Sequence, residues 1–302
     1  MTRFASKTLL LTSLLFLFCA PAFTQTSTSN TVYLYDELGR LKAVLTPSGD
    51  AAIYNYDAAG NIVSITRQPS TNVSILEFTP DKGPAGSSVK IYGTGFSLTP
   101  ALNTVLINGV AATVTAASAT QLIVTVPTGA TSGHISVITA GGTAVSSGYF
   151  FVPPLPLTAA SVAFASRIAL GETKPLSLTA ANRIALIVFD GNAGQRVALH
   201  ATNSTIASST VRVIKPDGTN LFNPVSLRGN WFVDPFTLPV SGTYTIVIDP
   251  GSTFTGTMNL TLHTVSTTTP GQNASLTFTQ PLRVSASVWT NKRDADQQCS
   301  NN

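Results

Sequence analysis

The chain has 302 residues, of which 43% are hydrophobic and only 10% are charged, with a formal net charge of +4. Soluble domains carry roughly 25% charged residues, and helix surfaces depend on Glu, Lys and Arg, so this composition favours strands and excludes a mainly helical protein. Lys292-Arg293 is the only run of basic residues, which argues against a nucleic-acid partner. The length suits two small sandwiches with a further segment at each end.

Residues 1–22 are typical of a signal peptide. Arg3 and Lys7 precede an apolar core from Leu9 to Phe18, and Ala20-Pro21-Ala22 supplies small residues at −3 and −1 of a cleavage site. The ten-residue core is too short to cross about 30 Å of hydrocarbon as a helix. We therefore expect a secreted protein, extracellular or at the cell surface, with no membrane span after cleavage.

Two alternatives for this segment are an uncleaved anchor and a lipoprotein attached through Cys19, although Phe18 stands where lipid attachment requires a small residue. Cleavage after Ala22 would remove Cys19 and leave only Cys299, so no intramolecular disulfide could form. It would also remove two of the 17 basic residues, leaving 15 against 13 acidic ones and a charge of +2.

Residues 31–68 contain two copies of one motif, offset by 21 positions. Tyr33-Leu34-Tyr35-Asp36 recurs as Tyr54-Asn55-Tyr56-Asp57, and Gly39-Arg40-Leu41 recurs as Gly60-Asn61-Ile62. Tyr-x-Tyr puts two aromatic rings on one face of a strand; Asp then bonds the backbone of a turn and Gly adopts positive φ.

This motif resembles the YD repeat of Rhs and teneurin-type proteins, in which many units wind into a β-shell. Because about three stacked units are needed to close a core, two copies predict a small sheet resting on the next domain, or a partly mobile segment.

Residues 73–152 alternate apolar and polar positions between clusters of Gly, Pro and Ser, which is typical of an antiparallel sandwich. The pattern predicts that Pro80 ends a strand, that Val89 and Ile91 point inward, and that Phe96 closes one end of the sandwich. Asn108-Gly109 is a strong signal for a two-residue hairpin turn. The residues that carry a family resemblance follow one another in this order: Phe78-Thr79-Pro80, Gly83-Pro84, Val89 to Gly93, Gly95-Phe96, Ile107-Asn108-Gly109 and Val124 to Pro127. With them the segment resembles the IPT/TIG domain, an immunoglobulin-like sandwich of secreted and surface proteins and some transcription factors.

Residues 153–158 form a proline-rich linker, which we expect to be stiff and extended. Residues 159–266 contain further alternating runs separated by turn sequences, and they predict a second sandwich. The segment resembles the bacterial pre-peptidase C-terminal domain, a jelly-roll-like sandwich appended to secreted enzymes; the residues that carry this resemblance are Gly194 to Val197, Pro216-Asp217-Gly218, Leu238-Pro239 and Ser241 to Thr245.

Residues 267–302 echo the start of the second sandwich and then become polar. Asn273 to Phe278 resembles Asn182 to Phe189, so the segment reads as an incomplete second copy with a disordered tail. The whole chain is therefore predicted to be all-β: two consecutive β-sandwiches, Ig-like and then jelly-roll-like, preceded by a short YD-repeat hairpin region. It reads as a fragment of something longer.

No catalytic residue, cofactor site or metal site is predicted. His134, His200 and His263 lie in alternating runs and are interpreted as sheet-surface histidines. Three acidic residues at strand ends allow calcium, which prefers clustered oxygen ligands, but Asp is also the ordinary turn residue there; these are Asp190, Asp217 and Asp249. Four aromatic residues are candidate platforms for sugar stacking if they are exposed, although aromatic residues in sandwiches lie more often in the core; these are Tyr92, Tyr149, Trp231 and Trp289.

The leading hypothesis is a non-catalytic secreted or cell-surface β-module protein, a structural, adhesive or interaction scaffold whose partner is a protein or polysaccharide at the cell surface. One alternative is a carbohydrate-binding module, in which Trp231 would be the residue to test. Another is the N-terminal part of a toxin or enzyme whose catalytic domain lies beyond Asn302.

Overall fold

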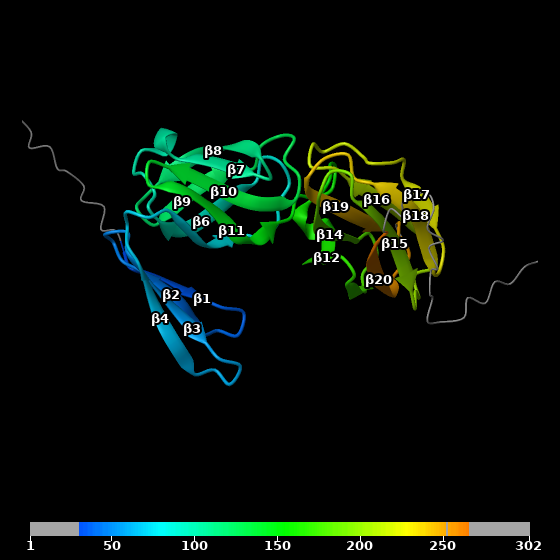
Figure 1. Cartoon of the computed structure of the whole chain (residues 1–302), viewed down its shortest axis with the longest axis horizontal. Coiled ribbons are helices and arrows are strands. Elements are labelled where there is room, and N and C mark those ends of the chain that lie inside the picture. The colour runs from blue at the N-terminus through cyan, green and yellow to red at the C-terminus, as the bar shows by residue number, and fades with distance from the viewer. Residues whose placement is uncertain (1–29, 252, 266–302) are drawn as a thin grey trace, which may run out of the picture.

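The structure is a computed structural model that describes residues 30–251 and 253–265. Over these residues the chain is all-β, as predicted, with two one-turn 3-10 helices, η1 (Pro100–Leu102) and η2 (Ala159–Ser161). Figure 1 shows two sandwiches side by side and a separate sheet that projects from the first of them. The predicted signal peptide and the predicted incomplete copy over 267–302 lie outside the described residues.

The separate sheet, called the repeat sheet below, contains both copies of the tyrosine motif. Its strands pair antiparallel in sequence order; they are β1 (Val32–Tyr35), β2 (Leu41–Leu45), β3 (Ala51–Tyr56) and β4 (Ile62–Gln68). Asp36 Oδ1 accepts a hydrogen bond from Arg40 N at 2.8 Å, and Asp57 Oδ1 accepts the equivalent bond from Asn61 N, also at 2.8 Å. Positive φ occurs in both turns, at Gly39 and Gly60. The predicted turn chemistry is confirmed in both repeats.

One face of the repeat sheet packs on the first sandwich. Its buried residues Leu34, Ala43, Leu45 and Ala51 contact Leu76 and Tyr92 of that sandwich. An ion pair of 2.6 Å between Lys42 Nζ and Glu77 Oε2 joins the two units at the same place. The prediction of a small sheet resting on the next domain is therefore confirmed.

The first sandwich is one continuous antiparallel sheet of seven strands that folds over itself, in the order β11-β10-β7-β8-β9-β6-β5. The long strand β8 serves both halves, pairing with β7 at one end and β9 at the other. The strands are β5 (Ser74–Thr79), β6 (Ser88–Thr94), β7 (Thr104–Ile107), β8 (Val110–Ala117), β9 (Gln121–Thr125), β10 (Gly133–Thr139) and β11 (Gly142–Phe150).

The sequence predictions for this sandwich hold residue by residue. Strand β5 ends at Thr79, directly before Pro80. Val89 and Ile91 are fully buried, and Phe96 closes the same core. Asn108 and Gly109 have φ of 44° and 84°, the two positive values that a type I′ hairpin turn requires.

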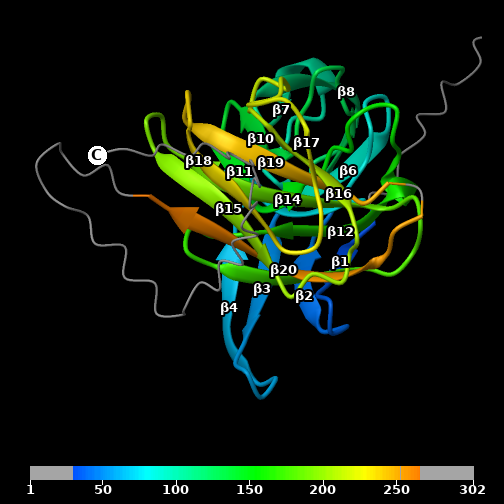
Figure 2. The same cartoon turned by 90° about the vertical axis from the view of Figure 1, so that its right-hand side faces the viewer.

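The second sandwich has a five-stranded sheet in the order β12-β14-β19-β16-β17 and a four-stranded sheet in the order β13-β20-β15-β18. All pairs are antiparallel except β12 with β14. The strands are β12 (Val162–Arg167), β13 (Thr173–Leu178), β14 (Ile184–Gly191), β15 (Arg196–Thr202), β16 (Ser209–Ile214), β17 (Val225–Leu227), β18 (Trp231–Thr237), β19 (Gly242–Asp249) and β20 (Gly256–Thr264). Figure 2 views this sandwich from its own end of the molecule.

Strand β14 is buried on both faces. Ala185, Ile187 and Phe189 point into the core between the two sheets. The alternate residues Ile184 and Leu186 point the other way and are equally buried, because they face the first sandwich. A strand that is buried on both faces has a continuous apolar run in its sequence, and here the run covers six consecutive positions.

Candidate functional site

The candidate functional site is the junction between the two sandwiches, where a hydrophobic cluster and a polar network lie side by side. Its apolar part, called the junction cluster, has Phe151 from the end of the first sandwich packed against the outer face of the five-stranded sheet. Burying a phenylalanine side chain stabilises a fold by about 1.5–3 kcal/mol. The buried members are Phe151, Val162, Ile184, Leu186, Val188, Ile214 and Val247.

The main chain around Phe151 is held on the first sandwich. Phe151 N donates to Asp81 O at 2.9 Å, and Gly83 N donates to Phe151 O at 3.0 Å. The next residue, Val152, donates from its N to Ser132 Oγ at 2.9 Å. Phe151 is therefore fixed by the first sandwich and buried by the second.

The proline-rich linker turns instead of running straight. Leu157 N donates to Pro154 O at 3.0 Å, and Leu157 packs against the junction cluster. The prediction of an extended linker is wrong at this point, because an apolar residue within it has a surface on which to fold back.

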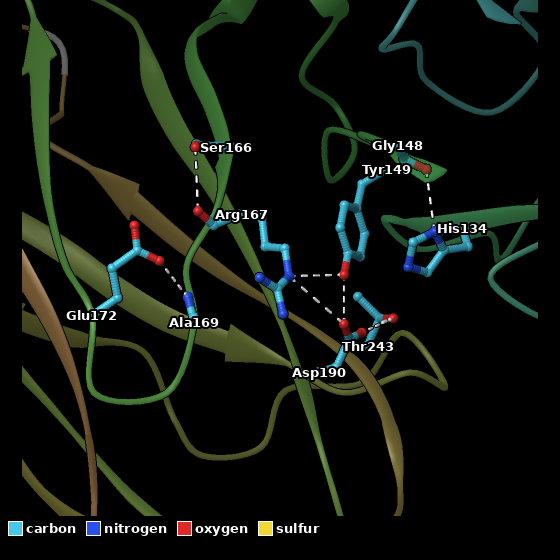
Figure 3. A network of polar contacts seen from close by, with 9 residues as sticks. All are labelled: His134, Gly148, Tyr149, Ser166, Arg167, Ala169, Glu172, Asp190 and Thr243. Carbon is cyan, nitrogen blue, oxygen red and sulfur yellow. Dashed lines mark hydrogen bonds and ion pairs between the residues drawn. The ribbon is translucent and has the colours of Figure 1, made fainter. Parts of the chain in front are cut away.

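A polar network crosses the junction beside this cluster (Figure 3). Tyr149 on β11 donates a short hydrogen bond from its hydroxyl to Asp190 Oδ2 at the end of β14. Arg167 Nε on β12 donates to the same tyrosine oxygen at 3.0 Å. Thr243 Oγ1 on β19 donates to the other carboxylate oxygen of Asp190 at 2.7 Å. One side chain of the first sandwich is thus held by a carboxylate and a guanidinium of the second.

The position of Tyr149 is set from the first sandwich as well. The ring of His134 lies against the tyrosine ring, with 4.0 Å between centroids, and His134 Nδ1 is 3.2 Å from Gly148 O. Partial burial raises the pKa of the Tyr149 hydroxyl, and its hydrogen bond to the Asp190 carboxylate raises that pKa further. The tyrosine is therefore a neutral donor at physiological pH.

A second set of polar contacts comes from the predicted hairpin turn. Asn108 Nδ2 donates to Thr131 Oγ1 at 2.7 Å, and Thr131 Oγ1 donates to Pro216 O of the second sandwich at 3.0 Å. A Cβ on Gly133 would lie within about 2.4 Å of the Asn108 side chain, so only glycine fits there. The turn between β7 and β8 is therefore part of the junction.

The loop that receives this contact is itself ordered by a carboxylate. Asp217 Oδ1 accepts from Thr219 N at 2.9 Å and from Thr219 Oγ1 at 2.7 Å, and Lys215 Nζ lies 3.0 Å from Asp217 Oδ2. These bonds, with those from the Thr219 backbone foremost, lower the pKa of Asp217 to about 2.

A small hollow of about 230 Å³ lies between the sandwiches, lined by Thr131, Ser132, the segment Val152 to Leu155, Ile214 and Thr245 among others. Thr245 Oγ1 is buried and has no hydrogen-bond partner within the described residues. The hollow is partly open and its lining is mainly apolar, with Thr131, Ser132 and Thr245 among its polar residues.

The three aspartates considered for calcium do not come together. Asp190 belongs to the junction network, Asp217 to its own loop, and Asp249 Oδ1 accepts from Gly251 N at 2.9 Å in a turn. Over residues 30–251 and 253–265, no group of three or more His, Cys, Asp or Glu side chains is placed to hold a metal ion. Within the same ranges, no helix has the length and hydropathy needed to span a membrane.

The histidines lie on sheet surfaces. His134 contacts Tyr149 at the junction, whereas His200 on β15 and His263 on β20 are neighbours on the outer face of the four-stranded sheet. Partial burial lowers the pKa of His200, and the nearby His263 lowers it further. The structure therefore separates the three histidines into one junction residue and one pair.

The described aromatic candidates for sugar stacking are not on a free surface. Trp231 is only 6% exposed and belongs to the core of the second sandwich. Tyr92 packs under the repeat sheet, and Tyr149 lies in the junction network. Of the two places considered for Trp231, the structure shows the core, because β18 turns the side chain inward. Trp289 lies outside the described residues.

Sequence reasoning missed the junction, although one signal for it was present. The run Ile184 to Phe189 is apolar at every position, which indicates a strand with a second buried face. No comparable signal marked Tyr149 or Asp190, because their contact joins residues 41 positions apart in different sandwiches.

Comparison with family models gives two matches. The description IPT/TIG domain matches residues 73–152, and RHS Repeat matches residues 35–73. A comparison with curated protein sequences found no match.

Several solved structures are similar over part of the chain. An auxiliary nutrient binding protein from Bacteroides thetaiotaomicron is 22% identical, over 36% of this chain and 22% of its own, with a TM-score of 0.26. The pre-peptidase C-terminal domain of collagenase from Bacillus anthracis is 18% identical, over 32% of this chain and 93% of its own, with a TM-score of 0.29. SGBP-B of the Bacteroides ovatus mixed-linkage glucan utilization locus, in complex with a mixed-linkage heptasaccharide, is 11% identical, over 70% of this chain and 81% of its own, with a TM-score of 0.23.

The chain spans about a fifth of the length of the nutrient binding protein named above. The family models match consecutive segments that coincide with the repeat sheet and the first sandwich. This protein therefore contains an RHS repeat followed directly by an IPT/TIG domain.

Proposed function

We propose that this protein is a non-catalytic, secreted or cell-surface scaffold in which the junction holds two β-sandwiches in one fixed relative orientation. The junction is the observation that carries the proposal. It combines a buried aromatic side chain, Phe151, with side-chain hydrogen bonds that run from Tyr149 and Thr131 to the second sandwich. Domains connected by a flexible linker make few such contacts, and their relative motion is then the default expectation.

The repeat sheet adds a surface that is available to a partner. Tyr33 and Tyr35 are 55% and 58% exposed, and they lie on the face that points away from the first sandwich. Aromatic side chains are enriched in protein interfaces because they bury a large area with few rotatable bonds. A fixed pair of sandwiches would hold this tyrosine face at a set distance from whatever the second sandwich contacts.

The proposed partner is a protein or polysaccharide at the cell surface, and the proposed location follows from the leader over residues 1–22. The carbohydrate-module alternative is less well supported, because its described aromatic candidates are committed to the core, the repeat-sheet contact and the junction.

The test begins with the full chain expressed in cells that export it. We expect it in the medium or on the outer surface, where protease added to intact cells digests it, and we expect purified protein to bind a surface fraction. Treating that fraction with proteinase or with periodate distinguishes a protein partner from a polysaccharide. Retention in the cytoplasm would contradict the proposal, as would turnover of ester, peptide, glycoside or phosphoester substrates by the purified chain.

A matched pair of variants separates scaffold function from simple binding. Tyr35→Ala changes the exposed tyrosine face, whereas Phe151→Ala changes the junction and leaves that face intact. The scaffold proposal expects Tyr35→Ala to weaken capture of the partner. It expects Phe151→Ala to retain capture by the repeat sheet while losing the fixed distance between sandwiches.

A further inference from the structure

The outer face of the four-stranded sheet in the second sandwich brings two imidazoles together. His200 on β15 pairs in register with Thr261 on β20, and His263 on β20 pairs with Ala198 on β15. The two histidines are therefore diagonal neighbours on adjacent antiparallel strands. Their ring centroids are 5.7 Å apart, with the ring planes inclined by 33°.

The strands hold both rings on the same side of the sheet. Leu199 and Ala201 flank His200, Leu262 precedes His263, and these three residues are fully buried in the core of the sandwich. Because successive side chains in a strand point to opposite faces, both imidazoles must point outward. Both histidines are half-buried, so part of each residue remains accessible to solvent.

This separation suits a shared metal ion. Metal–nitrogen distances for histidine are about 2.0–2.1 Å, which places each ring centre about 3 Å from the ion and the two centres about 5–6 Å apart. The centroid distance of 5.7 Å falls in that interval. A shared ion then requires rotation about the side-chain bonds that aims one nitrogen of each ring at the same point.

The surroundings restrict the pair without blocking it. The ring of Phe232 on β18 meets His200 edge to face, with centroids 5.8 Å apart, and so limits the movement of that imidazole. Thr261 and Thr173 hydrogen-bond to each other at 2.8 Å through their hydroxyls, which occupies these oxygens. The cross-strand neighbour of His263 is Ala198, a small residue that offers no competing ligand atom and is itself buried.

We propose that His200 and His263 form a two-histidine site for a divalent transition-metal ion, with water completing the coordination. Imidazole suits copper, nickel and zinc, whereas calcium and magnesium require oxygen ligands that do not gather at this place in the described residues. The general order of divalent affinities predicts tighter binding of Cu²⁺ than of Ni²⁺ or Zn²⁺. The site lies on β15 and β20, separate from the Tyr149–Asp190 network of the junction.

The test uses the full chain without a polyhistidine tag and with Cys19 and Cys299 replaced by Ser, because thiolates also bind these ions. CuCl₂ and ZnCl₂ are titrated in separate experiments and followed by calorimetry. Electron paramagnetic resonance of the Cu²⁺ sample reports how many nitrogen atoms coordinate the ion. The expected result is one bound ion with two histidine nitrogens.

Variants decide the assignment. Each of His200→Gln and His263→Gln is expected to weaken binding by about tenfold or more, equivalent to about 1.4 kcal/mol. His134→Gln, which changes the histidine outside the pair, is expected to leave the affinity unchanged. Circular dichroism checks that all three variants are folded, and His263→Ala provides a second replacement if Gln itself coordinates the ion.

Three results would overturn the site. The first is binding that is equally strong in the unaltered chain and in the His200 and His263 variants, which would place the ion elsewhere. The second is a resonance spectrum with a single coordinating nitrogen that persists in either variant. The third is the absence of any heat or spectral change over the titration.

Discussion

Phe151 and Val152 are consecutive in the chain, yet they bury their side chains in two different hydrophobic cores. Val152 lies in the core of the first sandwich, and Phe151 lies in the junction cluster with residues of the second. Adjacent side chains of extended backbone point in opposite directions, so one short segment can complete both cores. No free hinge therefore separates the last residues of the first sandwich from the surface of the second.

The first prediction concerns Phe151→Ala. Removing a buried phenylalanine side chain costs about 3–5 kcal/mol where the surroundings cannot collapse. The loss falls on the junction, because Phe151 does not belong to the internal core of either sandwich. Calorimetry should show one cooperative unfolding transition in the unaltered chain and two separate transitions in the variant.

Phe232→Ala is the matched control, since Phe232 is 51% exposed on the second sandwich. Its effect on the transition should be small. If Phe151→Ala unfolds with the same single transition as the control, Phe151 does not couple the two sandwiches.

The second prediction concerns the hydrogen bond between Tyr149 and Asp190. In a double-mutant cycle of Tyr149→Phe and Asp190→Ala, residues of one hydrogen-bond network give interaction energies of about 0.5–3 kcal/mol. Both side chains are partly exposed, so a value near 1 kcal/mol is expected. Urea unfolding of the four proteins measures it, and additive effects would mean that the contact contributes nothing to stability.

The third prediction is a dependence on pH. The pKa of Asp217 is about 2 in the folded chain against an ordinary value of 3.8. A folded pKa below the unfolded one favours the charged carboxylate in the fold, so its contribution is present above pH 3.8 and is lost as pH falls toward 2. The thermal midpoint should therefore decline over this interval.

Asp217→Asn removes that titrating group and keeps an acceptor oxygen for Thr219. The variant should be less stable than the unaltered chain at pH 7, and the difference should shrink as pH approaches 2. A difference that stays constant from pH 7 to pH 2 would show that the charge of Asp217 has no part in stability.

The fourth prediction compares two glycines of the first sandwich. A Cβ on Gly93 would lie 1.9 Å from Ser74 O of the neighbouring strand, so Gly93→Ala must push β5 and β6 apart. We expect a loss of about 3 kcal/mol, the upper part of the usual range for overpacking. Gly109→Ala meets open space and carries only the strain of positive φ, about 1 kcal/mol. Chemical denaturation measures the free energy of unfolding of both variants, and equal losses of that free energy would contradict this prediction.

The elements predicted best from the sequence are those that depend on local chemistry. The Asp and Gly turns of the repeats, the Asn108-Gly109 hairpin and the inward side chains Val89 and Ile91 follow from backbone preference and a period of two. The orientation of the Trp231 side chain could not be predicted in this way, because an aromatic residue at the start of a strand can face either side of the sheet. The pairing of β18 with β15 sets which side it faces.

The junction could not be assembled from the sequence, because its members have no local relationship. Asp190 reads as a turn residue at the end of a strand, and only the arrangement of two sandwiches places it against Tyr149. The same holds for His200 and His263, which are 63 positions apart and meet through the register of β15 with β20. Long-range pairing of this kind depends on topology and not on composition.

The fixed junction is tested most directly by a distance measurement between the two sandwiches in solution. Spin labels are placed at Leu102 and Val225, two exposed positions on different sandwiches, in a chain with Cys19 and Cys299 replaced by Ser. Double electron–electron resonance should give one narrow distance distribution in this chain and a broad one after Phe151→Ala. A distribution that is already broad with Phe151 in place would contradict a fixed junction.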